Sequence, residues 1–73
     1  MNLIKLLTVN DLFTAELIKE FLEKEGIPVV IKRTKWFDNP YLGSVGPRDL
    51  YVEEKDLELA KSLLKQENFD IEL

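Results

Sequence analysis

The sequence predicts a single α+β domain over residues 1–73, a ferredoxin-like two-layer βαββαβ sandwich. The first observation is the order of local patterns, in which two amphipathic helices alternate with four short strand-like segments. The second is length, because 73 residues with 45% hydrophobic side chains can build one modest core. The third is a short repeat: Asp11-Leu12-x-x-Ala15 recurs as Asp56-Leu57-x-x-Ala60, each time after a predicted strand. In this fold the antiparallel sheet has strand order 4-1-3-2, and both helices cover one face.

The first half of the chain reads as strand, helix, strand. Residues 3–8 form a short segment with apolar side chains at both odd and even positions, as in a central strand that is covered on both faces. Asn10 or Asp11 can cap a helix over residues 11–25. Its apolar stripe recurs at three- and four-residue spacing and comprises Thr14, Ala15, Leu17, Ile18, Phe21 and Leu22. Gly26 suits the left-handed residue after the helix, and residues 29–33 form a β-branched second strand.

The second half repeats this order after a long connection. Residues 34–47 are rich in Gly and Pro and predict a loop, and residues 49–53 predict a third strand. Residues 55–66 carry a second apolar stripe of helical period. Residues 69–73 alternate apolar and acidic side chains, which predicts a half-buried fourth strand.

The alternation of side chains predicts a half-apolar face on the side of the sheet away from the helices. If Ile4, Leu6, Leu50 and Val52 face the helices, this open face carries Leu3, Lys5, Leu7 and Tyr51. Such a face, or the exposed edge of the strand at 29–33, is a candidate homodimer surface.

The composition argues against several classes of site. The chain contains no Cys and no His, so disulfides, thiolate metal sites and the commonest general base are excluded. We therefore expect no metal and no cofactor. No apolar run approaches the length of a membrane span, and the N-terminus does not resemble a signal peptide, so we expect a cytoplasmic protein with no membrane partner.

The charge is unevenly distributed. Residues 32–48 hold four basic side chains and one acid, a local balance of +3, whereas the other residues sum to −7. Nucleic acid is disfavoured as a partner, because binding phosphates requires a broad basic face.

Other functions of ferredoxin-like domains lack their residues here. Metal-transport domains need a Cys pair, and RNA-recognition domains need aromatic residues on the first strand, but residues 3–8 have none. Small acyl-phosphate hydrolases place an Arg in a Gly-rich first loop, where this chain has Thr8-Val9-Asn10. We therefore expect a protein that is not an enzyme.

The first helix and its exit resemble a known bacterial family. Residues Ala15-Glu16-Leu17-Ile18-Lys19, followed by Leu22-Glu23-x-Glu25-Gly26-Ile27-Pro28, are similar to the signature of proteins catalogued as putative prokaryotic signal-transducing proteins, a domain of unknown function. Val52-Glu53-Glu54-Lys55-Asp56-Leu57-Glu58-Leu59-Ala60 resembles a later pattern of the same family. The resemblance covers essentially the whole chain and implies a fold related to the nitrogen-regulatory PII proteins. It implies no enzymatic activity.

The 34–47 loop is the segment best suited to binding. It is longer than usual for a connection between two strands, and it holds the only Trp of the chain among further aromatic residues and cations. Aromatic rings combined with Arg and Lys are typical of interfaces and of sites for planar anions. The candidate binding residues in and around this loop are Lys32, Arg33, Lys35, Trp36, Phe37, Tyr41 and Arg48.

Several hypotheses follow for this segment. In the first, a regulatory module docks on an unidentified protein partner through the loop. In the second, a sensor binds a small anionic metabolite or nucleotide near the basic strand ends. In the third, the chain is a purely structural homodimer, formed through a strand edge or the open face, with no further ligand. The alternative to a binding role for the aromatic side chains is that they pack on the chain's own sheet or on a second protomer. Ordinary solvation of the charged strand ends, with Arg48 paired to Asp38 or Asp49, is the alternative to an anion site.

Overall fold

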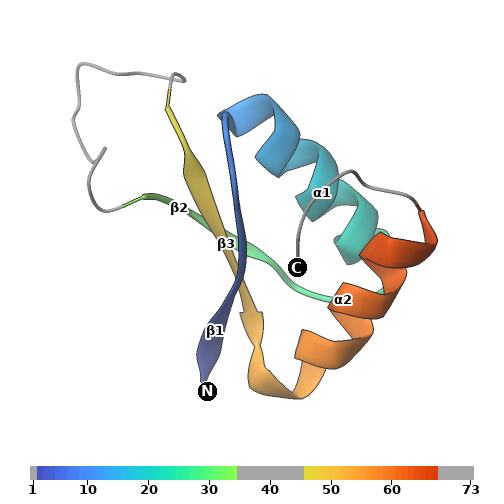
Figure 1. The fold of residues 1–73 in the computed structure, drawn as a ribbon. Coiled ribbons are helices and arrows are strands. Elements are labelled where there is room, and N and C mark those ends of the chain that lie inside the picture. The colour runs from blue at the N-terminus through green and yellow to red at the C-terminus, as the bar shows by residue number, and fades with distance from the viewer. Residues whose placement is uncertain (1, 35–45, 68–73) are drawn as a thin grey trace.

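The computed structural model describes residues 2–34 and 46–67 and has the predicted order of elements up to the second helix (Figure 1). Five helices and strands and one short 3-10 turn make up this part of the chain. They are β1 (Leu3–Val9), α1 (Leu12–Lys24), β2 (Val30–Arg33), β3 (Arg48–Glu53), the 3-10 turn at Glu54–Asp56, and α2 (Leu57–Gln66). The predicted fourth strand at residues 69–73 lies outside the described residues.

The described part of the sheet has three strands in the order β1-β3-β2, and both pairings are antiparallel. β3 therefore lies between two strands that precede it in the chain, as the split βαβ arrangement requires. This confirms an α+β fold with a small antiparallel sheet, and it matches the 1-3-2 portion of the predicted order. The full four-stranded 4-1-3-2 order stays a prediction.

Both ends of α1 are fixed by local hydrogen bonds. The Asp11 side chain accepts a hydrogen bond from the Thr14 backbone N–H at 2.7 Å, which confirms Asp11 as one of the two predicted caps. At the other end the Gly26 N–H donates to the Glu23 carbonyl, and the Ile27 N–H donates to the Leu22 carbonyl, each at 3.0 Å. Gly26 has φ +88°, so this is a Schellman motif with the left-handed residue where the sequence predicts it.

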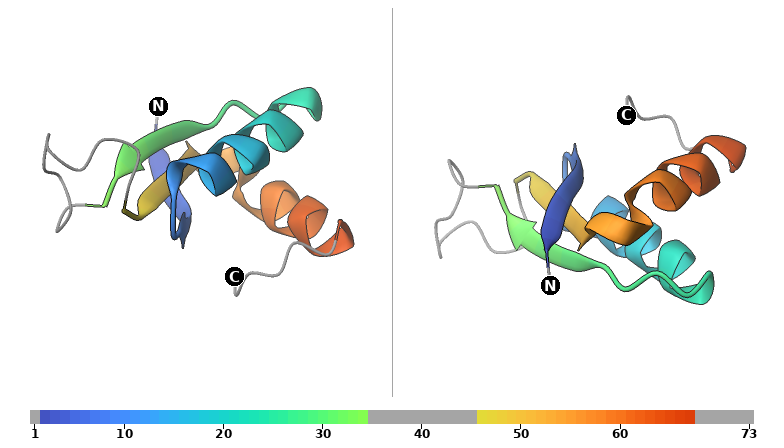
Figure 2. Two further views of the ribbon diagram at one scale, coloured as in Figure 1. Left: turned by 90° about the horizontal axis from the view of Figure 1, so that it is seen from above. Right: turned by 90° about the horizontal axis from the view of Figure 1, so that it is seen from below.

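One core joins all the described elements. Both helices lie on the same side of the sheet (Figure 2) and bury their apolar stripes against it. The two Ala residues of the internal repeat, Ala15 and Ala60, are both completely buried where the helices approach the sheet. The remaining core residues are Leu6, Leu7, Val9, Ile18, Leu22, Ile27, Val29, Leu50, Val52 and Leu64.

A β-bulge in β1 changes the predicted composition of the open face. Lys5 pairs with Tyr51 and Leu7 pairs with Leu50, so Leu6 is an extra residue between them. Because of this insertion Leu7 shares the face of the fully buried Leu50, and only 7% of Leu7 is exposed. The prediction that Leu7 lies on the open face is therefore wrong, because strict alternation does not hold across a bulge.

Candidate functional site

The candidate site is the end of the sheet where β2 ends and β3 begins. Of the connection predicted to carry function, the structure describes Thr34, which follows β2, and Gly46 and Pro47, which precede β3. The Thr34 N–H donates to the Pro47 carbonyl at 3.4 Å, which extends the β2–β3 ladder by one hydrogen bond beyond Arg33. The two ends of the connection are thus joined directly to each other.

Asp49 holds all three strands together at this end. It lies on the open face in the middle strand, opposite Thr8 of β1 and Lys32 of β2, and only 5% of it is exposed. Its Oδ1 accepts hydrogen bonds from the Thr8 hydroxyl at 2.6 Å and from the Thr34 hydroxyl at 2.9 Å. Its Oδ2 lies 4.0 Å from the Lys5 Nζ. A buried carboxylate is costly unless it is paired, and these contacts supply the pairing.

Arg48 fixes the returning end of the connection. Only 4% of this residue is exposed, and its Nη1 donates to the Gly46 carbonyl at 2.9 Å and to the Pro47 carbonyl at 3.3 Å. The guanidinium group therefore satisfies backbone acceptors at the turn into β3. Gly46 itself has φ +101°, a conformation that favours Gly at this turn.

Two exposed lysines lie beside Asp49 and Tyr51 on the open face. The Lys32 Nζ lies 5.2 Å from the centre of the Tyr51 ring, within the range of a cation–π contact. Lys5 pairs in register with Tyr51 but extends toward Asp49 in the next row. In the part of the chain that the structure describes, this end of the open face therefore presents two ammonium groups beside one carboxylate and one aromatic ring.

The structure describes three of the seven predicted binding residues. Lys32 is exposed on the open face, whereas Arg33 and Arg48 are register partners on the opposite face. The described cations are therefore divided between two faces at this end of the sheet. Lys35, Trp36, Phe37 and Tyr41 lie outside the described residues.

Sequence reasoning missed the residues that organise this end of the sheet. From the sequence, Asp49 is predicted only as an alternative partner of Arg48, and Lys5 only as a member of the open face, whereas the structure pairs Asp49 with Thr8, Thr34 and Lys5. Thr8 and Thr34 are assigned no role of their own by the sequence. The alternation of side chains in the sequence was one signal. Asp49 begins the strand predicted at 49–53, and Tyr51, two residues later, is predicted on the open face, so Asp49 is predicted on that face too. An acid at that position of a central strand needs partners on the neighbouring strands.

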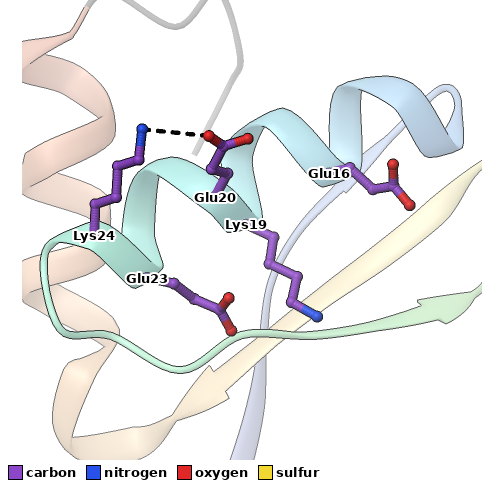
Figure 3. A pocket seen from close by; sticks show the side chains of 5 residues that line it. All are labelled: Glu16, Lys19, Glu20, Glu23 and Lys24. Carbon is purple, nitrogen blue, oxygen red and sulfur yellow. Dashed lines mark ion pairs between the residues drawn. The ribbon is translucent and has the colours of Figure 1, made fainter.

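A shallow hollow along the exposed side of α1 does not form a second converging site. Five charged residues of this one helix line it, and Figure 3 shows Glu20 and Lys24 projecting to one side and Glu16, Lys19 and Glu23 to the other. Glu20 and Lys24 form an exposed i,i+4 ion pair at 3.3 Å. Exposed pairs of this kind add little stability and do not hold a ligand in one place.

Within residues 2–34 and 46–67, no group of three or more acidic side chains is arranged to hold a metal ion. No described helix is both long enough and apolar enough to cross a membrane.

Three comparisons with known proteins bear on identity. Searches of curated proteins and of solved structures gave no significant match. The relation in fold to the PII proteins and a cytoplasmic location therefore stay predictions. The sequence profile of a family described as "Putative prokaryotic signal transducing protein" matches residues 3–68, which include every described helix and strand. Because this match spans nearly the whole chain, and the resemblance of α1 and its Schellman exit agrees with it, the protein belongs to that family.

Proposed function

We propose that this protein is a non-enzymatic regulatory module that takes part in signal transduction by docking on a protein partner through residues 34–47. The observation that carries the proposal is the double anchoring of this connection. Thr34 is bonded to Pro47 and Asp49, and Arg48 is bonded to Gly46 and Pro47. The family description agrees with a role in signalling at this general level.

Anchored ends favour binding by the segment between them. Association costs conformational entropy for every group that becomes ordered, and fixing the ends of a segment in advance reduces that cost. The segment contains Trp36, Phe37 and Tyr41 together with Lys35. Trp, Tyr and Arg are the residues most enriched among those that dominate binding energy at protein interfaces, and Phe is enriched in interface cores.

The proposal is tested by affinity capture from the source bacterium with quantitative mass spectrometry. We expect Trp36→Ala to lose a partner that the wild-type protein retains. The matched control is Phe13→Ala, because Phe13 is an aromatic residue of α1 that is 72% exposed and distant in sequence from the connection. Circular dichroism should show the same fold for all three proteins.

The outcomes distinguish specific docking through residues 34–47 from nonspecific binding. Capture of the same partner by wild type and Phe13→Ala, with loss in Trp36→Ala, supports docking through residues 34–47. Equal capture by all three proteins overturns it.

The two open-face lysines favour one alternative, a sensor of small anions. The Lys32 ammonium group lies over the Tyr51 ring and the Lys5 ammonium group lies beside Asp49 on the same face, and exposed ammonium groups next to an aromatic ring suit a small carboxylate or phosphate ester. A ligand at one hundred times its Kd would stabilise the fold by about 2.7 kcal/mol. A thermal-shift screen of nucleotides and organic acids, with Lys32→Ala as the negative control, tests this alternative.

A further inference from the structure

Among residues 2–34 and 46–67, the outer edge of β2 has a backbone position that no other strand pairs with. Within the described residues β2 pairs only with β3, and it forms one side of the sheet (Figure 2). The hydrogen bond from Thr34 to Pro47 fixes the phase of the antiparallel ladder. Alternate residues of such a strand direct their N–H and C=O groups toward or away from the partner strand. Thr34, Lys32 and Val30 thus bond toward β3, and the backbone groups of Ile31 point outward.

The first outward N–H of this edge already contacts a carboxylate. The same alternation directs the Val29 N–H outward, and it donates to the Glu23 Oε2 of α1 at 3.5 Å. Ile31 follows two residues later, with its side chain packed against the core. The contact that Glu23 provides at Val29 has no counterpart at Ile31 among the described residues.

The side chains along this edge differ between the two faces of the sheet. On the open face lie Val30, 37% exposed, and Lys32, whose ammonium group makes only the Tyr51 contact among the described residues. On the helix side lie Ile31 and, near the start of the strand, the Glu23 carboxylate. A strand added at this edge would therefore lie beside the Lys32 ammonium group on the open face. On the helix side it would lie beside Ile31 and the Glu23 carboxylate.

We propose that the β2 edge binds an extended partner segment of alternating acidic and apolar residues, which adds a strand to the sheet. Its acidic side chains face the open side, where one of them pairs with Lys32, and its apolar side chains face the helix side beside Ile31. The main-chain hydrogen bonds to Ile31 supply affinity, and the alternation supplies specificity. This inference rests on the proposed function, because it names the chemistry of the partner that the module binds.

The charge of β2 argues for such a partner over a second copy of this edge. In an antiparallel pair of two β2 edges that sets Lys32 opposite Lys32, or in one that centres on Ile31 and makes the two Lys32 side chains diagonal neighbours, like charges lie close together, which is destabilising. Lys on an edge strand commonly prevents self-association of that kind. An acidic partner segment instead places a carboxylate next to Lys32, and the two opposite charges attract each other.

The test measures binding of a fluorescent synthetic peptide of alternating Val and Asp by anisotropy, against a peptide of alternating Val and Lys. We expect the wild-type protein to prefer the acidic peptide. Lys32→Glu should weaken that binding about tenfold or more and reverse the preference, because like charges then face each other. Lys65→Glu, an equal change of charge on an exposed side chain of α2, should bind as the wild type does.

A second pair of variants tests the backbone contact. Ile31→Pro removes the outward N–H but leaves the β2–β3 ladder intact, whereas Ile31→Ala loses similar packing and keeps the N–H. We expect binding to be lost in Ile31→Pro and retained in Ile31→Ala, with circular dichroism confirming that both are folded. Binding that survives both Lys32→Glu and Ile31→Pro overturns the proposal, as does the absence of binding to the wild type.

The proposal for the β2 edge and the proposal for residues 34–47 can be overturned independently of each other. Trp36→Ala should bind the acidic peptide as the wild type does, and a loss there places the peptide on the connection and overturns the edge proposal. Sedimentation of the wild type as a dimer that Lys32→Glu dissociates also overturns it, because a second copy then occupies the edge. A negative peptide result leaves docking through Trp36 standing, since the capture experiment tests that separately.

Discussion

Asp49 stabilises the end of the sheet where β2 ends and β3 begins. Its carboxylate is almost completely buried and accepts from hydroxyl groups contributed by two different segments, Thr8 and Thr34. Asp49→Ala removes both acceptor contacts and leaves the partly buried Thr34 hydroxyl unpaired. We expect a loss of about 1–3 kcal/mol in the free energy of unfolding, measured by urea denaturation.

Asp49→Asn is the matched control, because it keeps an acceptor oxygen at nearly the same position. It should lose less stability than Asp49→Ala, since the hydroxyl donors retain a partner. If Asp49→Ala unfolds at the same urea concentration as the wild type, the three-strand contact does not stabilise the fold.

At the scale of the element, the bulge in β1 places two leucines of the same strand parity in different environments. Leu7 is 7% exposed and Leu3 is 39% exposed, although strict alternation would place both on the open face. We expect Leu7→Ala to lose about 2–4 kcal/mol of unfolding free energy, as truncation of a buried leucine does. Leu3→Ala should lose less than about 1 kcal/mol, because it buries less area. Equal losses in the two variants, measured by urea denaturation, would contradict the bulge.

Elements with a local cause were predictable from the sequence, and long-range register was not. The start and end of α1 follow from Asp11 and Gly26, whose effects act within one helical turn. The bulge at Leu6 depends on how β1 is paired with β3, a strand about forty residues away, and no local residue signals it. The 3-10 turn at Glu54–Asp56 likewise replaces the start of the second helix, which the apolar stripe predicts over residues 55–66 and which begins at Leu57 in the structure.

The same distinction between local features and long-range register applies to the candidate site. The basic and aromatic composition around the connection could be identified from the sequence, as could the length of the connection itself. The roles of Arg48 and Asp49 could not, because they depend on which strands meet at this end of the sheet. Only the folded register shows that Arg48 is buried while Lys32 is exposed.

At the scale of the whole molecule, a single core makes unfolding cooperative. Side chains from every described strand and both helices contribute to one cluster, with Ile18 completely buried in it. A chain of this length has an unfolding free energy of about 4–11 kcal/mol. Ile18→Ala should remove about 2–5 kcal/mol of it, enough to populate the unfolded state measurably.

The measurement follows urea unfolding by circular dichroism and by the amide resonances of β3 and α2. Coincident midpoints are expected for wild type, because neither layer retains a core of its own. Leu59→Ala is the control, since Leu59 is 52% exposed on α2 and should change stability by less than about 1 kcal/mol. Separate transitions for sheet and helix would contradict a single core.

The anchored base between Thr34 and Gly46 also bears on how such a protein can diversify. Its hydrogen bonds involve backbone groups and the side chains of Thr34, Arg48 and Asp49, all of them outside the segment at 35–45. Doubling the length of a surface connection costs only about 0.6 kcal/mol in closure entropy. Changes in the length or composition of residues 35–45 therefore leave these anchoring groups in place, so the sequence between Thr34 and Gly46 can vary while the anchor stays the same.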